Sequence, residues 1–201
     1  MPGRSLWVAF ALSLATVDPG GADMLSDETP AYERCALCHG LFGDSPRDKF
    51  PRLAGQRPAY IASQIRAFLD GQRRNDGGQM VAVVTELGPD DIALVVDWFS
   101  SQAQPDPILS DDTTAEAMET GYIAYLSAGC EECHDERGSG AINIPYLASQ
   151  HPAYLAKQMR DMRDGRRFGV SIDVMRAQLS SLSDADLDAI AAYLAAQDRT
   201  E

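Results

Sequence analysis

Basic residues are scarce in this chain. Its 201 residues include 17 lysines and arginines against 30 aspartates and glutamates, which gives a formal net charge of −13. Nucleic acids and anionic membrane surfaces attract basic patches, so this balance argues against both as partners. It favours a chain that meets basic proteins, although acidity also serves simply to keep a protein in solution.

Long hydrophobic runs are also missing. The apolar run from Leu6 to Ala15 has ten residues, whereas a helix needs about 20 apolar residues to cross a bilayer. Arg4 precedes this run, and small residues suited to cleavage occur at Ala15 and Ala22. This arrangement is typical of a secretory signal peptide. We therefore expect residues 1–22 to be a signal peptide, the mature chain to have no membrane span, and the protein to be periplasmic.

Cysteine and histidine are few, and most of them occur together. The four cysteines form two Cys-x-x-Cys motifs, each followed at once by one of the three histidines. The motifs are "RCALCHG", with Cys35, Cys38 and His39, and "GCEECHD", with Cys130, Cys133 and His134. Two disulfides would suit an exported protein but leave the histidines unexplained. One shared zinc ion is disfavoured because the pairs lie more than ninety residues apart.

Covalent haem attachment uses this motif. Cysteines three apart on a helical turn reach the two vinyl groups of a haem, and the following histidine becomes an axial ligand of the iron. We therefore expect two covalently bound haem c groups.

The two motifs belong to an internal duplication. Their cysteines and histidines match at an offset of 95 residues, and "PRLAGQRPAY" matches "PYLASQHPAY" at an offset of 94. Two copies of one unit indicate a duplicated domain. We expect domains at 25–102 and 113–201, joined by a linker at 103–112 that contains two prolines.

Strand patterns are absent, and helical patterns are frequent. In "PAYIASQIRAFLDGQRR" the apolar residues are spaced for one helix face. In "LSDADLDAIAAYLAAQ", Ser183 is the expected N-cap. An all-α fold is therefore predicted. A unit of roughly 80 residues is small for a stable core, and a large cofactor would supply the missing apolar volume.

Each iron then needs a sixth ligand. Met80 is available in the first copy, and Met159, Met162 and Met175 are available in the second. Met159 and Met162 lie three apart on one helix face, as core residues do. Met80 and Met175 match in the repeat, so we expect both to lie in loops and to complete His/Met coordination. His151 competes for the second iron, but its register predicts a solvent-facing position.

These features resemble the dihaem class I c-type cytochromes of the cytochrome c4 family. The resemblance covers Tyr32 to about Gln197 and includes "GQRRND" after the first helix pattern. It implies two tandem cytochrome c domains packed about a pseudo-twofold axis. It also implies that the Pro51 and Pro145 carbonyls bond the ligand histidines. The second copy departs from the pattern because Asp135, not glycine, follows its histidine.

The resemblance implies a function in respiratory electron transfer rather than an enzyme activity. A six-coordinate iron has no place for a substrate, so the chain would carry single electrons. The donor would be a membrane quinol-oxidising complex or a dehydrogenase, and the acceptor a terminal oxidase or reductase. Two alternatives stay open: a haem subunit of a periplasmic dehydrogenase complex, and a haem enzyme with one open iron.

Negative charge is concentrated in the second copy. Residues 25–104 have 11 acidic and 8 basic residues, whereas residues 105–201 have 17 and 8. The second motif is surrounded by acids, namely Glu131, Glu132, Asp135 and Glu136. We expect a basic partner to dock near the second haem.

Overall fold

The computed structural model describes residues 29–169 and 171–199, so the expected signal peptide at 1–22 lies outside the described residues. Within these ranges the regular elements are all helices, which confirms the predicted all-α fold. The helices are α1 (Ala31–His39), α2 (Pro58–Leu69), α3 (Gln79–Val84), α4 (Pro89–Ser100), α5 (Ala115–Ser127), α6 (Glu131–His134), α7 (Pro152–Arg163), α8 (Ile172–Leu179) and α9 (Asp184–Ala195).

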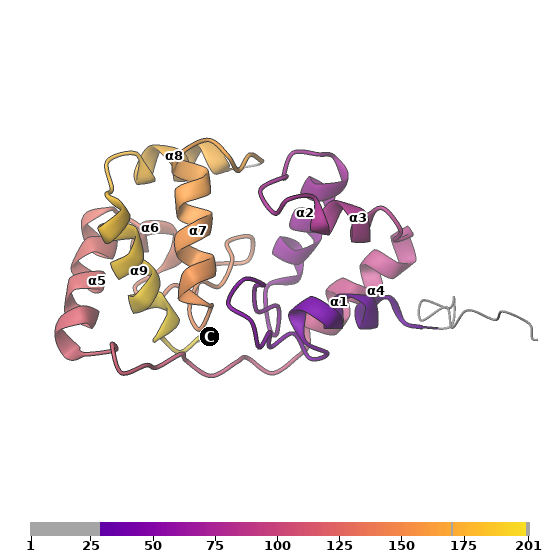
Figure 1. Cartoon of the computed structure of the whole chain (residues 1–201), viewed down its shortest axis with the longest axis horizontal. Coiled ribbons are helices and arrows are strands. Elements are labelled where there is room, and N and C mark those ends of the chain that lie inside the picture. The colour runs from indigo at the N-terminus through magenta and orange to yellow at the C-terminus, as the bar shows by residue number, and fades with distance from the viewer. Residues whose placement is uncertain (1–28, 170, 200–201) are drawn as a thin grey trace, which may run out of the picture.

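The helices form two groups that lie side by side (Figure 1). In the first repeat, α4 packs on α1 and α2, and α3 packs on α2. In the second repeat, α9 packs on α5 and α7, and α8 packs on α7. Residues 103–110 lie in no helix and connect the groups along one edge of the molecule. There the Ile108 N–H donates to the Ala195 carbonyl, 2.8 Å away, which fixes the connection to the end of α9.

Helix starts follow from local sequence. Pro58 and Pro152 occupy the first turns of α2 and α7, where proline costs no hydrogen bond. Ser183 is the N-cap of α9, as predicted: its hydroxyl accepts the Asp186 N–H, and the Asp186 carboxylate accepts the Ser183 N–H at 2.8 Å. This reciprocal capping satisfies two helix-end groups that would otherwise lack partners.

Each repeat has its own hydrophobic core, and matching positions fill both. Met159 and Met162 are buried in the second core, where the first core has Ile65 and Phe68. Methionine fills such irregular apolar space well. The prediction that these two methionines serve packing is therefore confirmed.

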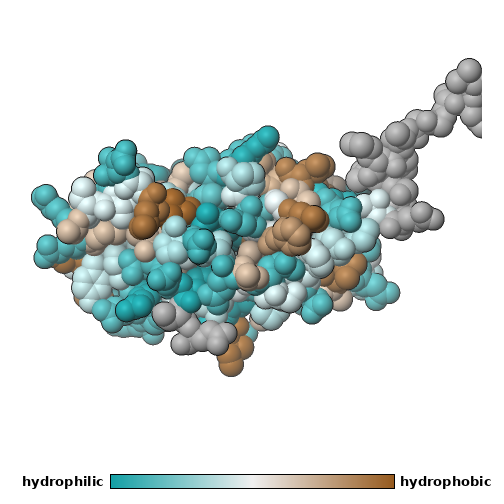
Figure 2. Space-filling model, turned by 90° about the horizontal axis from the view of Figure 1, so that it is seen from below, coloured by the Kyte–Doolittle hydropathy of each residue, from teal (hydrophilic) through white to brown (hydrophobic). Residues whose placement is uncertain are grey.

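The face of the molecule seen in Figure 2 is mostly hydrophilic, with apolar side chains scattered among the polar ones. Of the helices described, none combines the length and the apolar character needed to cross a membrane.

The two repeats bind each other through matching residues. The Gln56 side chain donates to the Tyr146 carbonyl and accepts the Tyr146 N–H, both at 3.0 Å. Its counterpart Gln150 makes the same pair of bonds with Arg52, at 2.9 and 2.8 Å. Such reciprocal contacts are those of two copies related by a twofold rotation.

His151 belongs to the same interface, so the expectation that it faces solvent is wrong. It is 7% exposed, and its Nε2 lies 2.9 Å from the Ser45 carbonyl oxygen of the first repeat. Its counterpart Arg57 donates to the Ser139 carbonyl of the second repeat at 3.2 Å. The register of one repeat does not reveal that the other repeat covers this position.

Candidate haem sites

The first Cys-x-x-Cys-His motif occupies the end of α1. Cys35 is half-buried, and His39 is 5% exposed at the last helical position. Gly40 then turns the chain at a φ of 77°. A Cβ atom there would lie 2.6 Å from the Asp44 carbonyl oxygen, so only glycine fits this turn.

The His39 ring is fixed by one backbone bond. Its Nδ1 lies 2.9 Å from the Pro51 carbonyl oxygen. Because a carbonyl only accepts, Nδ1 is the donor, and Nε2 is the nitrogen left for a metal. Burial lowers the pKa of His39, the Pro51 bond opposes this, and the Arg73 charge adds to the lowering. The imidazole is thus held in the neutral form that ligates iron.

The second motif is built differently. Here α5 ends at Ser127, and a separate turn, α6, carries the motif from Cys130 to His134. Asp135 follows with a φ of 57°, a conformation that costs of order 1–3 kcal/mol for a residue other than glycine. Its carboxylate accepts two backbone N–H groups of the loop, those of Arg137 and Ser139, at 2.8 and 3.0 Å. The backbone conformation of Asp135 is strained, but these two hydrogen bonds stabilise the turn. Asp135 can therefore stand where the first repeat has glycine.

The second histidine is less firmly oriented than the first. His134 is 7% exposed, and burial lowers its pKa. The Pro145 carbonyl is close enough to oppose this lowering, yet the geometry of a hydrogen bond is not reached, and the buried Nδ1 has no partner among the described residues. The two repeats thus differ in the contact that orients the ligand.

Met80 and Met175 lie in short helices, α3 and α8, rather than in the expected loops. Both are half-buried, and each packs against the core of its repeat. The same cores hold Cys35 in the first repeat and Cys130 in the second. The fold therefore brings the methionine and the first cysteine of each motif to the margin of one core.

The cysteines are available for attachment. All four are free thiols in the structure, which does not support the two-disulfide alternative. Burial is the main cause that raises the pKa values of Cys35 and Cys130 to about 11. Nor do three or more of the described His, Cys, Asp and Glu side chains gather as a metal site, so a shared zinc ion is not supported either. Paired thiols beside a buried neutral histidine fit covalent haem.

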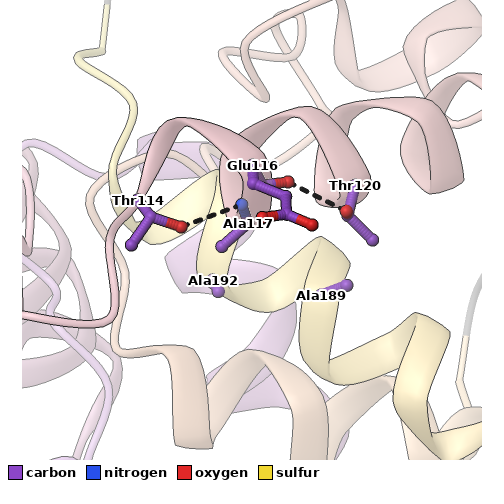
Figure 3. Close-up of a pocket in the computed structure, with 6 residues that line it drawn as sticks. All are labelled: Thr114, Glu116, Ala117, Thr120, Ala189 and Ala192. Atoms are coloured by element: carbon purple, nitrogen blue, oxygen red, sulfur yellow. Dashed lines mark hydrogen bonds between the residues drawn. The ribbon is translucent and has the colours of Figure 1, made fainter.

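One hollow of the described surface lies away from both motifs. It has a volume of about 350 Å³, lies between α5 and α9, and is lined by Thr114, Glu116, Ala117, Thr120, Ala189 and Ala192 (Figure 3). The lining contains no residue of either motif, and its hydroxyl groups already serve the helix: Thr114 accepts the Ala117 N–H, and Thr120 donates to the Glu116 carbonyl. This hollow is helix surface rather than a cofactor site.

Sequence reasoning missed a set of polar residues between the repeats. Tyr60, Gln64 and Arg73 match Tyr154, Gln158 and Arg167 at the offset of 94, and these six side chains bond one another across the interface. The signal was available, because polar residues that recur at equal places in both copies need a shared reason.

An all-helical duplicated fold with two Cys-x-x-Cys-His motifs defines a c-type cytochrome with two haems, a carrier of single electrons. The cytochrome c family model matches residues 118–198. Cytochrome c4 of Pseudomonas aeruginosa is 32% identical over 80% of this chain and 82% of that protein. The cytochrome c4 structure of Acidithiobacillus ferrooxidans covers 82% of this chain and 99% of its own, with 30% identity and a TM-score of 0.71.

The chain belongs to the cytochrome c4 family, and it carries two covalently bound haem c groups. A second kind of relative is named a thiosulfate dehydrogenase electron acceptor. This protein, from Thiomonas intermedia, is 30% identical over 84% of this chain and 80% of its own length.

Proposed function

We propose that the chain passes single electrons between redox proteins of the periplasm through two haems with His/Met coordination. His39 and Met80 are the axial ligands of one iron, and His134 and Met175 are those of the other. The thioether bonds are made by the two cysteine pairs, Cys35 with Cys38 and Cys130 with Cys133. Pro51 orients His39, and we propose that Pro145, whose carbonyl lies near the His134 ring, takes the same part in the second repeat once the haem is attached.

The orientation of His39 is the observation that carries this proposal. Its Nδ1 is bound to Pro51, so its free nitrogen is the one that can face an iron attached through Cys35 and Cys38. When bound, haem c supplies a one-electron iron couple. The chain supplies attachment, two axial ligands and a buried setting, and it leaves no coordination position for a substrate. We therefore propose a carrier without an enzyme activity of its own.

A redox titration followed by visible absorption tests the coordination, with carbon monoxide added to the reduced protein. Two haems that ignore carbon monoxide and keep the methionine-to-iron charge-transfer band when oxidised are the expected result. Binding of carbon monoxide at one haem would instead indicate an open iron and favour the enzyme alternative.

The relative from Thiomonas intermedia favours a specific donor. Its name describes an electron acceptor of thiosulfate dehydrogenase. A dehydrogenase that oxidises a sulfur compound is therefore our second candidate, as donor to the carrier rather than as part of it. Stopped-flow mixing with such an enzyme and thiosulfate should reduce both haems, and thiosulfate alone should reduce neither.

The acidic surface of the second repeat favours a basic partner. Glu132, Asp135 and Glu136 are exposed beside the second motif, and Glu131 is half-buried. Opposite charge on a partner would speed the encounter and orient it toward this haem. A terminal oxidase or reductase with a basic docking face is the acceptor that we propose.

A further inference from the structure

The backbones of the two ligand methionines are held in different ways. Met80 is the second residue of α3, whereas Met175 is the fourth residue of α8. The first N–H groups of a helix have no acceptor within that helix. Met175 lies far enough along α8 for its N–H to donate to the Ser171 carbonyl, 3.4 Å away. The Met80 N–H instead needs an acceptor from a side chain.

Asp76 supplies this acceptor. Its Oδ2 accepts the Met80 N–H at 2.5 Å, and its Oδ1 accepts the Gly78 N–H at 3.1 Å. Hydrogen bonds to an ionised acceptor are shorter than neutral ones and roughly twice as strong. Both oxygens of one carboxylate are therefore bound to the backbone that carries the methionine.

The segment between Asp76 and Met80 needs such a contact. Gly77 and Gly78 have φ values of 75° and 84°. A Cβ atom at either position would find no heavy atom within 4 Å beyond its chain neighbours, so packing does not fix these glycines. Glycine loses more conformational freedom on folding than any other residue. The two carboxylate bonds span the glycine pair and limit this freedom.

Asp76 itself follows a fixed point of the chain. The carbonyl of the preceding residue, Asn75, accepts a bond from the Lys157 Nζ at 2.7 Å. The Asn75 side-chain amide donates to the Asp161 carboxylate, also at 2.7 Å. The chain is thus held before the glycine pair by these contacts with α7, and after the pair by the carboxylate of Asp76.

The second repeat holds its methionine without such a residue. At the offset of 95 that pairs Met80 with Met175, Asp76 pairs with Ser171. Ser171 is exposed, and its side chain does not cap α8. Asp173, one turn further on, is exposed and forms an ion pair with Arg176 at 2.8 Å. Met175 is therefore placed by the backbone of α8 and by packing against the second core.

We propose that Asp76 is a positioning residue for the sixth ligand of the first iron, and that the second iron has no such dependence. This inference rests on the His/Met coordination proposed above. A competing ligand can take the place of Met80 only when the segment that carries this methionine moves away, and the Asp76 carboxylate opposes that movement. Imidazole is a suitable competitor, because neutral nitrogen donors suit iron. Its nitrogen replaces the methionine sulfur on the oxidised iron, and no electron is transferred.

Imidazole titration of the oxidised protein with both haems tests the proposal. Methionine that is isotope-labelled in its methyl group is followed by NMR, since the paramagnetic iron shifts the signal of a bound methionine. Met80→Ala and Met175→Ala assign the two shifted signals. In Asp76→Ala the imidazole concentration that displaces Met80 should fall about fivefold, which is about 1 kcal/mol and the usual contribution of such a bond. The concentration that displaces Met175 should not change.

Two further variants separate this role from charge and from general stability. Asp76→Asn removes the charge but keeps one acceptor oxygen, so it should hold Met80 more firmly than Asp76→Ala does. Asp91→Ala removes a similar carboxylate bond of the same repeat, which Asp91 makes to the Gly88 N–H at 2.9 Å. It should lower the free energy of unfolding and leave the displacement of Met80 unchanged.

The proposal is overturned if Asp76→Ala unfolds more readily but releases Met80 at the wild-type imidazole concentration, because the carboxylate would then only stabilise the fold. It is also overturned if Asp91→Ala loosens Met80 as much as Asp76→Ala does. In both cases two signals shifted by iron would still support the proposed coordination. If neither Met80→Ala nor Met175→Ala removes a shifted signal, the coordination is wrong, and the role of Asp76 falls with it.

Discussion

The two attachment loops, residues 35–42 and 130–137, each make one matching contact with the last helix of their repeat, α4 or α9, and differ in what they expose to solvent. Trp98 donates its indole N–H to the Leu41 carbonyl in the first loop, and the matching Tyr193 donates its hydroxyl to the Glu136 carbonyl in the second. The exposed side chains of the two loops are different. The first loop exposes Leu37, Leu41 and Phe42, where the second has Glu132, Glu136 and Arg137.

This difference shows that the residues around the haem sites are alike in the two repeats, whereas the exposed residues beside the motifs are not. Ligands, caps and core positions recur at fixed offsets because each repeat must hold the same cofactor. The exposed positions next to the motifs do not contact the cofactor and are free to differ, and one loop is apolar where the other is acidic. Two equal redox centres with unlike surroundings suit a carrier that meets two unlike partners.

Removal of one cysteine pair should have the largest effect, because it should leave a haem in only one of the two repeats. Cys35→Ala/Cys38→Ala should leave one covalent haem instead of two, because both thioether bonds of that repeat are lost. Intact-mass spectrometry of the denatured protein counts the haems. The matched variant Cys130→Ala/Cys133→Ala should lose the other haem, and two haems in either variant would contradict the assignment.

Methionine substitutions should open one iron at a time. Met80→Ala and Met175→Ala are each expected to bind carbon monoxide at one reduced haem, with a lower potential at that haem, because methionine ligation favours reduced iron. Visible absorption measures both effects.

Met159→Leu is the control, because it keeps the core volume. It should reduce the free energy of unfolding by less than about 1.5 kcal/mol and leave both irons closed. Carbon monoxide binding in His151→Ala but not in Met175→Ala would transfer the ligand role to His151.

Asp161 has no counterpart in the first repeat, where Ala67 stands. Burial raises the pKa of Asp161, but hydrogen bonds from Lys157, Arg166 and Asn75 outweigh burial and lower it. A lowered carboxyl pKa contributes stability above the ordinary pKa, and this stability is lost as pH falls through the lowered value. Asp161→Asn should therefore reduce the free energy of unfolding by about 1–3 kcal/mol at neutral pH.

Urea unfolding at neutral pH and at about pH 3 measures this difference, which should shrink in acid as the wild-type carboxylate takes up its proton. Ala67→Ser in the first repeat is a control that should behave alike at both pH values. If Asp161→Asn reduces the free energy of unfolding equally at neutral and acid pH, the contribution of Asp161 comes from its shape and not from its charge.

The sequence predicted what is local and missed what arises between the copies. Ser183 and the apolar periodicity of α2 and α7 act within a few residues, so the helices could be expected. The six residues of α3 are too few for periodicity to reveal, so the sequence predicts a loop at Met80. The prediction for His151 is wrong for another reason. Its burial depends on Ser45, 106 residues away, which no pattern within one repeat can show.

The smallest effect should come from the acidic surface itself. Glu132→Gln and Glu136→Gln remove charge beside the second motif, and glutamine keeps an acceptor for the Tyr122 hydroxyl that Glu136 now binds. We expect the two changes together to slow oxidation by a cationic ruthenium ammine complex roughly threefold at low salt, and much less at high salt, because screening removes the attraction. Stopped-flow absorption gives these rates. Leu37→Gln, at the position that matches Glu132, should leave them unchanged. Equal rates for the double variant and the wild type at low salt would mean that the acidic surface is only solvated and attracts no cationic reagent.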